Sequence, residues 1–504
     1  MQNSTYHIYN ASAGSGKTYT LAKAYLKIIL SKKTAANYRE ILALTFTNKA
    51  VNEMKDRIIS SLYEFGNVLD LKKAPPMFLD ISKELNIDST TLQQRAKISL
   101  KEILHNYAFF DISTIDKFTH RLIRTFAKDL KLPQNFEVIL DTNLVLSEAV
   151  DRLVNKAGSD SELTKVLIAF ALEKANEDKS WDITRDIFEM GNELLFKEKY
   201  ENALETLAQK KLSDFNGLKK LLKEHIANTE LFIIEVSKIT LQFIYTSGYS
   251  DKDFPRETLP NHFKKISAGE FIPLKLYANK LEENLSENKI VLSKSPTPDA
   301  SVCSEILSGY LKIKEAVYRR AMLKNAYKNV VPLTVLNALQ KEVKNLELER
   351  DEIPLATFNS IISKEIKNQP VPFIYERLGE KYRHYFIDEF QDTSELQWNN
   401  LIPLIGNALE SEDEKGSKGS LLIVGDAKQA IYRWRGGKAE QFLDLVQQEK
   451  NPFVLQPDIE NLPANYRSYD EVIKFNNDFF TAISPSINNA VYKQLFEEGN
   501  KQTY

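Results

Sequence analysis

A glycine-rich stretch near the N-terminus has the residue types of a phosphate-binding loop. Residues 11–18 read Ala-Ser-Ala-Gly-Ser-Gly-Lys-Thr, which matches the pattern G-x-x-x-x-G-K-S/T except that Ala11 replaces the first glycine. Gly14 and Gly16 would let backbone N–H groups approach phosphate oxygens closely. Lys17 would reach the β- and γ-phosphates, and Thr18 would offer its hydroxyl to Mg²⁺. The stretch therefore predicts a nucleoside triphosphate site formed by Ala11, Ser12, Ala13, Gly14, Ser15, Gly16, Lys17 and Thr18.

Two adjacent carboxylates, Asp388 and Glu389, end an apolar stretch of strand length. An acid at such a position near a phosphate loop usually holds the nucleotide's Mg²⁺ through water, so we assign Asp388 to the metal. Glu389 would orient and deprotonate the attacking water. The alternative is that both acids merely end a strand, and the phosphate loop favours the catalytic interpretation.

Three further side chains could complete a nucleotide site. Gln429 follows the apolar run of residues 421–424 and could sense a γ-phosphate. Arg467 could bond a terminal phosphate, and Tyr466 beside it could stack on a base. Alone, the segment that holds Tyr466 and Arg467 would mean little.

Aromatic rings and guanidinium groups alternate in the turn formed by Tyr432, Arg433, Trp434 and Arg435. This combination suits stacking on unpaired bases together with phosphate contacts. A place in the hydrophobic core is the alternative for each ring.

Three residues at two other strand ends are candidates for nucleic-acid contacts. Phe46 and Asn48 follow the apolar run 41–45, at the end of a parallel strand where ligands of open α/β sheets collect. Phe46 could stack on a base, although such a residue is more often part of the core. Thr114 could touch a backbone phosphate or simply cap the helix that follows it.

A parallel sheet would bring these distant segments together. Residues 6–9 have the bias of a short strand, and from Thr18 to residue 30 apolar residues recur at helical spacing. This strand and helix flank the glycines and the Lys-Thr pair, which argues against an ordinary Gly/Ser turn. The continuous apolar run 41–45 is typical of a strand that is covered on both faces. Residues 135–323 instead have the pattern of long amphipathic helices, which indicates a helical insertion.

The composition is that of a globular protein. The 504 residues are 43% hydrophobic and 27% charged, and the net charge is −2. Nucleic acid would therefore have to bind in a local groove rather than on a globally basic surface. A single cysteine, Cys303, excludes an internal disulfide framework and a four-cysteine metal site. No apolar run approaches the ~20 residues of a membrane span and no signal peptide is apparent, so we expect a cytoplasmic protein without a membrane partner.

Six motifs, in this order, resemble those of the UvrD/Rep/RecB-type superfamily 1 helicases: ASAGSGKT, LTFTNKAVNEM, STIDKF, FIDEFQDTSELQW, VGDAKQAIYRWRGG and LPANYRS. The first and fifth are closest to the RecB and AddA recombination branch. The resemblance implies an ATP site of Lys17, Thr18, Asp388, Glu389, Gln429 and Arg467. It also implies that Tyr466 stacks on adenine and that Gln2 takes the place of the family's adenine-reading glutamine. Phe46, Tyr432 and Trp434 would line a channel for single-stranded DNA.

The fold that the resemblance implies is α/β: a RecA-like P-loop NTPase with a parallel sheet and a large helical insertion domain. We expect the first RecA-like domain in residues 1–130 and 325–455, the insertion in 131–324 and the start of a second RecA-like domain in 456–504. Because the later family motifs do not follow, we expect this chain to be the N-terminal half of such a protein and to lack full motor activity.

The activity implied is ATP-dependent, Mg²⁺-requiring unwinding or translocation of DNA, 3′ to 5′, in repair or recombination. Its partners would be single-stranded DNA, junctions of single- and double-stranded DNA, and a recombination nuclease subunit. A nucleotide-dependent DNA-binding module without unwinding activity is the alternative. A small-molecule kinase on the same loop would explain neither the Gln391-Asp392 pair nor the Tyr/Trp/Arg turn.

Overall fold

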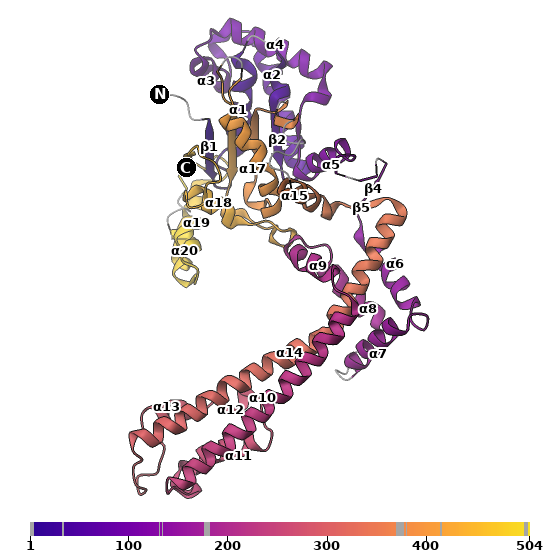
Figure 1. The fold of residues 1–504 in the computed structure, drawn as a ribbon. Coiled ribbons are helices and arrows are strands. Elements are labelled where there is room, and N and C mark those ends of the chain that lie inside the picture. The colour runs from indigo at the N-terminus through magenta and orange to yellow at the C-terminus, as the bar shows by residue number, and fades with distance from the viewer. Residues whose placement is uncertain are drawn as a thin grey trace. The chain divides into compact units, whose positions relative to one another are not determined.

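The computed structural model describes residues 5–32, 35–130, 132–133, 135–175, 182–368, 377–379, 381–413, 416–497 and 502–503. These residues form two compact units (Figure 1). The first unit consists of Met1–Thr142, Phe196–Glu201 and Glu349–Tyr504, and the second of Asn143–Leu195 and Asn202–Leu348. In the described part of the chain, every helix is too short or too polar to cross a lipid bilayer.

A six-stranded sheet forms the centre of the first unit, with the order β3-β2-β6-β7-β1-β8. All its neighbouring strands pair in parallel. Their bounds are β1 Tyr6–Ala11, β2 Ile41–Thr45, β3 Ile112–Thr114, β6 His384–Ile387, β7 Ser420–Gly425 and β8 Asp458–Leu462. The predicted α/β class with a parallel sheet is confirmed.

Helices cover both faces of this sheet, which explains why every residue of the inner strand β2 is buried. Ile41 and Ala43 of β2 pack into one core, whereas Leu42 and Leu44 point to the other. The first core is covered by α1 Lys17–Ser31, α2 Asn48–Gly66, α3 Pro76–Leu85 and α4 Ser89–His105. The second core is covered by α5 Ile115–Thr125, α15 Phe358–Asn368, α17 Glu395–Glu410 and α18 Ala439–Val446 (Figure 1).

The C-terminal part of the chain adds an edge strand and two helices to the first unit. β8 pairs with β1 from His7↔Asp458 to Ala11↔Leu462, and α19 Asp470–Ile483 and α20 Ala490–Glu497 follow. We expected residues 456–504 to begin a second domain; their first strand, β8, pairs with β1 of the main sheet, and this expectation stays a prediction. A separate parallel pair joins β4 Glu137–Ile139 to β5 Glu352–Pro354.

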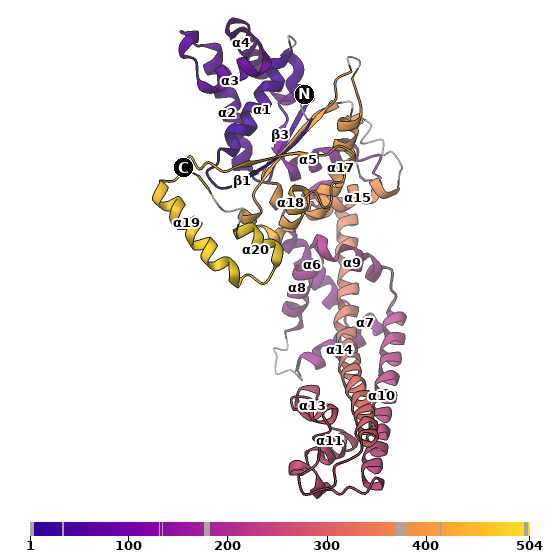
Figure 2. The same cartoon turned by 90° about the vertical axis from the view of Figure 1, so that its left-hand side faces the viewer.

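The second unit is helical. Its two longest helices, α10 Leu212–Thr246 and α14 Ala300–Arg350, lie side by side (Figure 2). Their shared core includes Ile233, Ile244, Phe263 and Tyr310. The other helices are α6 Thr142–Asn155, α7 Ser161–Ala175, α8 Ile183–Leu194, α9 Glu201–Ala208, α11 Thr258–Ser267, α12 Pro273–Leu276 and α13 Leu281–Ser286. Since α14 runs without interruption through residue 324, the expected boundary at 324/325 lies inside a helix, and the domain ranges stay a prediction.

Candidate functional site

The glycine-rich loop lies between β1 and α1, at the carboxyl edge of the parallel sheet. Gly14 and Gly16 adopt left-handed backbone conformations, with φ of 79° and 83°, which other residues adopt only with strain. The backbone N–H of Ser15 donates to the carbonyl of Ser12 at 3.2 Å, and the Ser15 hydroxyl donates to the same oxygen at 2.7 Å. These bonds curl the loop back on itself immediately before α1, so the loop has the compact turn that a phosphate-binding loop needs.

A segment after β8 packs directly on this loop. The N–H of Tyr466 donates to the carbonyl of Gly14 at 2.9 Å, and Asn465 Nδ2 donates to the carbonyl of Ala13 at 3.2 Å. Asn465 Oδ1 accepts from the N–H groups of Arg467 and Ser468, at 2.8 and 3.0 Å. A Cβ at Gly14 would lie 2.5 Å from Asn465 Oδ1, so glycine is required here. The structure thus places Tyr466 and Arg467 beside the loop, and their contacts with a nucleotide stay predictions.

Lys17 and Glu389 meet across 372 residues of sequence. Lys17 Nζ lies 3.2 and 3.1 Å from the two carboxylate oxygens of Glu389 and 3.4 Å from Gln429 Oε1. Glu389 adopts a left-handed conformation with φ of 51°, which costs a non-glycine residue about 1–3 kcal/mol. The strained residue lies just after the end of β6, and its conformation places the carboxylate next to Lys17, the first residue of α1. Three predicted catalytic side chains therefore form one hydrogen-bonded cluster.

Asp388 precedes this turn and is partly buried. Its Oδ1 accepts from the N–H of Glu389 at 2.9 Å. Burial raises its pKa to about 7, and the negative charge of Glu389 contributes to the same rise. A divalent cation would relieve the cost of placing these carboxylates together. Hydroxyl and carboxylate oxygens are the ligands that Mg²⁺ prefers, so the chemistry of Asp388 and Thr18 fits this ion.

The raised pKa of Asp388 predicts how stability changes with pH. Between its ordinary value of 3.8 and about 7, the folded chain binds more protons than the unfolded chain, so the free energy of unfolding falls as pH rises through this window. One pKa unit corresponds to about 1.4 kcal/mol, and the contribution is on the order of a few kcal/mol. In Asp388→Asn this contribution should be absent.

Urea denaturation of the wild type and Asp388→Asn at a series of pH values, without nucleotide or Mg²⁺, measures this effect. Asp392, whose pKa burial raises to about 6, acts in the same direction. His384, whose pKa burial lowers to about 4, opposes both. Because both groups are present in both proteins, the difference between the two curves isolates Asp388. Parallel curves would show that Asp388 is not a perturbed acid.

A network that the sequence analysis missed joins this cluster to the end of β7. Gln391 Nε2 donates to Glu389 Oε2 at 2.7 Å, and Gln391 Oε1 accepts from the N–H of Asp426 at 3.0 Å. Asp426 Oδ2 in turn accepts from Gln429 Nε2 at 2.7 Å. A Cβ at Gly425 would lie 2.9 Å from Gln391 Oε1. This glycine therefore leaves space for the Gln391 side chain, which bridges Glu389 and Asp426.

Lys428 is a second lysine at the glycine-rich loop, also missed from the sequence. Its Nζ donates to Ser12 Oγ at 3.1 Å and lies 3.3 Å from Asp426 Oδ1. Its position beside Gln429, in the turn after a buried strand, was the signal that could have identified it.

The aromatic turn forms a surface cluster rather than part of the core. The rings of Phe46 and Tyr432 lie 4.5 Å apart, and those of Tyr432 and Trp434 lie 6.3 Å apart. The guanidinium of Arg435 lies 5.5 Å from the ring centre of Phe46 and 5.8 Å from that of Trp434. Trp434 is 70% exposed, so the core interpretation is wrong for this residue.

Asp392 lies between the aromatic turn and the cluster of Lys17, Glu389 and Gln429, which we call the nucleotide cluster. The backbone N–H groups of Tyr432 and Ile431 interact favourably with its carboxylate, whereas Glu389 repels it. Asp392 Oδ2 also lies 3.5 Å from Gln391 Nε2. Gln391 and Asp392 therefore lie between the nucleotide cluster and the aromatic turn, and a Cβ at Gly437 would lie 3.0 Å from the Asp392 carbonyl and 3.1 Å from that of Tyr432.

For the remaining predicted residues, the structure gives a position but no sign of a role in binding. Thr114 is 7% exposed and its hydroxyl accepts from the N–H of Lys117 at 3.2 Å, which is the capping role named as its alternative. Asn48 is the first residue of α2 and its side chain is exposed. Nucleic-acid contacts of both residues stay predictions. Gln2 lies outside the described residues.

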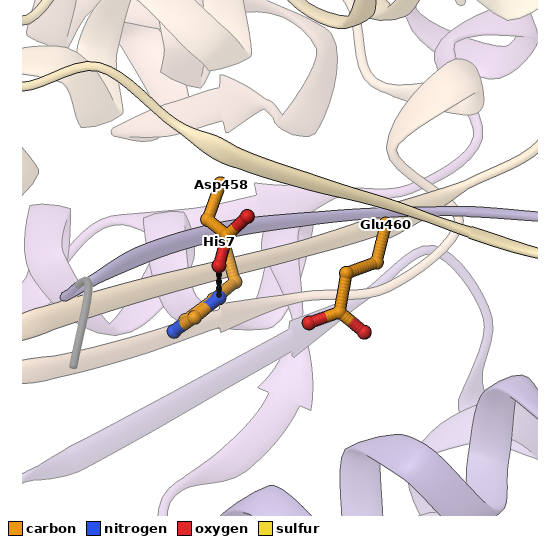
Figure 3. Close-up of side chains that lie close together, drawn as sticks. All are labelled: His7, Asp458 and Glu460. Carbon is orange, nitrogen blue, oxygen red and sulfur yellow. Dashed lines mark ion pairs between the residues drawn. The ribbon is translucent and has the colours of Figure 1, made fainter. Parts of the chain in front are cut away.

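A third group of polar side chains lies in the first halves of β1 and β8, away from the glycine-rich loop. His7 Nδ1 lies 3.6 Å from Asp458 Oδ2, and Glu460 is close by (Figure 3). The two acids are exposed. Because exposed acids on an edge strand often lie together without binding an ion, we assign no metal to this group.

Known proteins resemble this chain along most of its length. The sequence model of the family described as UvrD/REP helicase N-terminal domain matches residues 2–450. An ATP-dependent helicase/nuclease subunit from Lactobacillus acidophilus is 24% identical, over 95% of this chain and 39% of the relative. Its counterpart from Lactococcus lactis subsp. cremoris is 26% identical, over 94% and 38%. The RecBCD enzyme subunit RecB of Chlamydia trachomatis is 24% identical, over 98% and 44%. The chain spans less than half the length of these relatives.

Proposed function

The chain belongs to the UvrD/REP helicase N-terminal domain family, and we propose that it is the ATP- and DNA-binding part of a DNA helicase or translocase. The observation that carries the proposal is the series of contacts from Lys17 through Glu389 and Gln391 to Asp392. Asp392 in turn lies beside the turn at Tyr432, because a Cβ at Gly437 would lie 3.0 Å from the Asp392 carbonyl and 3.1 Å from that of Tyr432. A motor must couple the state of its nucleotide to its grip on the strand. These contacts join the nucleotide cluster, which would bind ATP, to the aromatic turn, which would bind the strand.

At the nucleotide site, we assign the first unit a RecA-like P-loop role. Lys17 would neutralise the β- and γ-phosphates, with Gln429 and Arg467 beside the terminal phosphate and Tyr466 against the base. A bound Mg²⁺, held by Thr18 and Asp388, would neutralise charge on the phosphates. Glu389 pairs with Lys17 at 3.1 Å, so with a γ-phosphate bound at Lys17 its carboxylate would lie nearby and would accept a proton from the attacking water.

At the DNA site, unpaired bases would stack on Phe46, Tyr432 and Trp434 while Arg435 holds a phosphate. The resemblance to the UvrD/Rep/RecB type supports 3′-to-5′ movement and a role in repair or recombination. The relatives from Lactobacillus acidophilus and Chlamydia trachomatis are named as subunits of a helicase/nuclease and of a RecBCD enzyme. We therefore also propose that the protein works at junctions of single- and double-stranded DNA, together with a nuclease subunit.

Replacement of the exposed tryptophan tests the DNA site. One base–aromatic stack contributes about 1–3 kcal/mol, so Trp434→Ala should weaken binding of a labelled oligothymidylate by roughly tenfold or more. The affinity for Mg·ATP should not change. Fluorescence anisotropy measures the first quantity and calorimetry the second.

Tyr63→Ala is the matched control, because Tyr63 is a 64% exposed aromatic residue of α2 outside the aromatic cluster. This variant should bind the oligonucleotide as the wild type does. If Trp434→Ala instead lowers the melting temperature and weakens both ligands together, Trp434 supports the fold and the stacking role is wrong.

A further inference from the structure

A six-residue segment within the helical stretch, Phe196–Glu201, belongs to the first unit, although the residues on either side belong to the second. It contains the 3₁₀ turn η4 Glu198–Tyr200 and the first residue of α9. Neither the nucleotide site nor the aromatic cluster explains why the chain returns to the first unit here. The side-chain contacts of its two glutamates, Glu198 and Glu201, show which elements of the first unit the segment binds.

Both glutamates bind side chains of α15. Glu198 Oε1 accepts from Asn359 Nδ2 at 2.9 Å, and Glu201 accepts from the hydroxyl of Ser360. Glu201 also pairs with Lys364 at 3.4 Å. The side chain of Ser394, the N-cap residue of α17, interacts favourably with the Glu198 carboxylate. Glu198 therefore binds α15 directly and lies close to the start of α17.

The same carboxylate lies beneath the end of the aromatic turn. A Cβ added at Gly436 would lie 3.6 Å from Glu198 Oε2 and 3.3 Å from Ser394 Cβ. Gly436 has φ of +94°, and the next residue, Gly437, pairs with Ser394 in an antiparallel bridge. Glu198 and Ser394 thus pack against the backbone at Gly436, directly after the aromatic turn.

We propose that Glu198 is a positioning residue for the aromatic turn. It packs beside Ser394 and fills the space next to Gly436, so that the turn holds the rings of Tyr432 and Trp434 in one arrangement for stacking on bases. A glycine at positive φ has the greatest backbone freedom, and ordering a loose turn on binding costs affinity. The inference rests on the proposed DNA-binding role of this turn, and it assigns part of that role to a segment from the helical stretch.

Glu198→Ala, Glu198→Gln and Glu201→Ala test the proposal in the full chain. Glu201→Ala is the matched control, because the contacts of Glu201 described above are with α15. Glu198→Ala should weaken oligothymidylate binding roughly three- to tenfold, within the energy of one lost stack, and should leave Mg·ATP affinity unchanged. Glu198→Gln retains an oxygen acceptor for Asn359 and should restore most of the binding. Glu201→Ala should bind the oligonucleotide as the wild type does.

The fluorescence of Trp434 gives a readout that a general loss of stability would not move. Acrylamide quenching of each variant is compared with that of its Trp434→Phe counterpart, and the difference isolates this tryptophan. Glu198→Ala should change the quenching and Glu201→Ala should not. Wild-type quenching and DNA affinity in Glu198→Ala, or equal losses in Glu201→Ala, would overturn the positioning role while the proposed function stands. Failure of the wild type to bind the oligonucleotide would overturn both.

Discussion

Glu389→Gln should slow the hydrolysis of Mg·ATP by roughly 10²–10⁴-fold, the usual contribution of a general base, while Mg·ATP still binds. Glutamine has nearly the same size and keeps an oxygen that can accept from Lys17, which lies 3.1 Å from the carboxylate. It cannot accept a proton from the attacking water. The variant should therefore lose hydrolysis of Mg·ATP while it keeps its affinity for Mg·ATP.

Single-turnover hydrolysis with protein in excess measures the chemical step even where turnover is slow. Glu395→Gln is the control, because Glu395 lies six residues away, is 62% exposed and pairs with Lys438; it should hydrolyse Mg·ATP as the wild type does. An unchanged rate in Glu389→Gln would show that another group takes the proton.

Lys17→Ala should weaken Mg·ATP binding roughly 10- to 150-fold, because a hydrogen bond to a charged group contributes about 1.5–3 kcal/mol. The variant also leaves Glu389 without its ion-pair partner beside Asp388, so two carboxylates would face the phosphates with less compensation. Both effects oppose binding of an anionic ligand.

Isothermal titration calorimetry with a non-hydrolysable ATP analogue measures this affinity directly. Lys27→Ala is the matched control, since Lys27 lies on the same helix but pairs with Glu84. Equal affinities in Lys17→Ala and the wild type would remove the assignment of the glycine-rich loop to phosphate.

Much of the site could be predicted because parallel strands carry their carboxyl ends to one edge of a sheet. Lys17 and Glu389 are far apart in sequence, yet each follows a strand of the same sheet, so their motifs were sufficient to place them together. The cluster of Phe46 with Tyr432 follows from the same geometry.

Other features depend on geometry that residue types do not specify. The bridge made by Gln391 requires the left-handed turn at Glu389 and the space above Gly425. The strand Asp458–Leu462 is largely exposed and polar, so it lacks the apolar signal of a central strand and its pairing with β1 was not expected. The helix α14 contains Pro332 and still runs from Ala300 to Arg350, because burial of its apolar residues outweighs one missing hydrogen bond.

In the proposed motor, the nucleotide cluster and the aromatic turn are coupled. Steady-state turnover of Mg·ATP by the wild type, measured over a series of oligothymidylate concentrations, tests this coupling. Turnover should rise with DNA to a plateau, with half of the increase reached at the dissociation constant measured by anisotropy, and Trp434→Ala should require correspondingly more DNA. Turnover that does not respond to DNA that is demonstrably bound would contradict the coupling and leave a DNA-binding module without motor function.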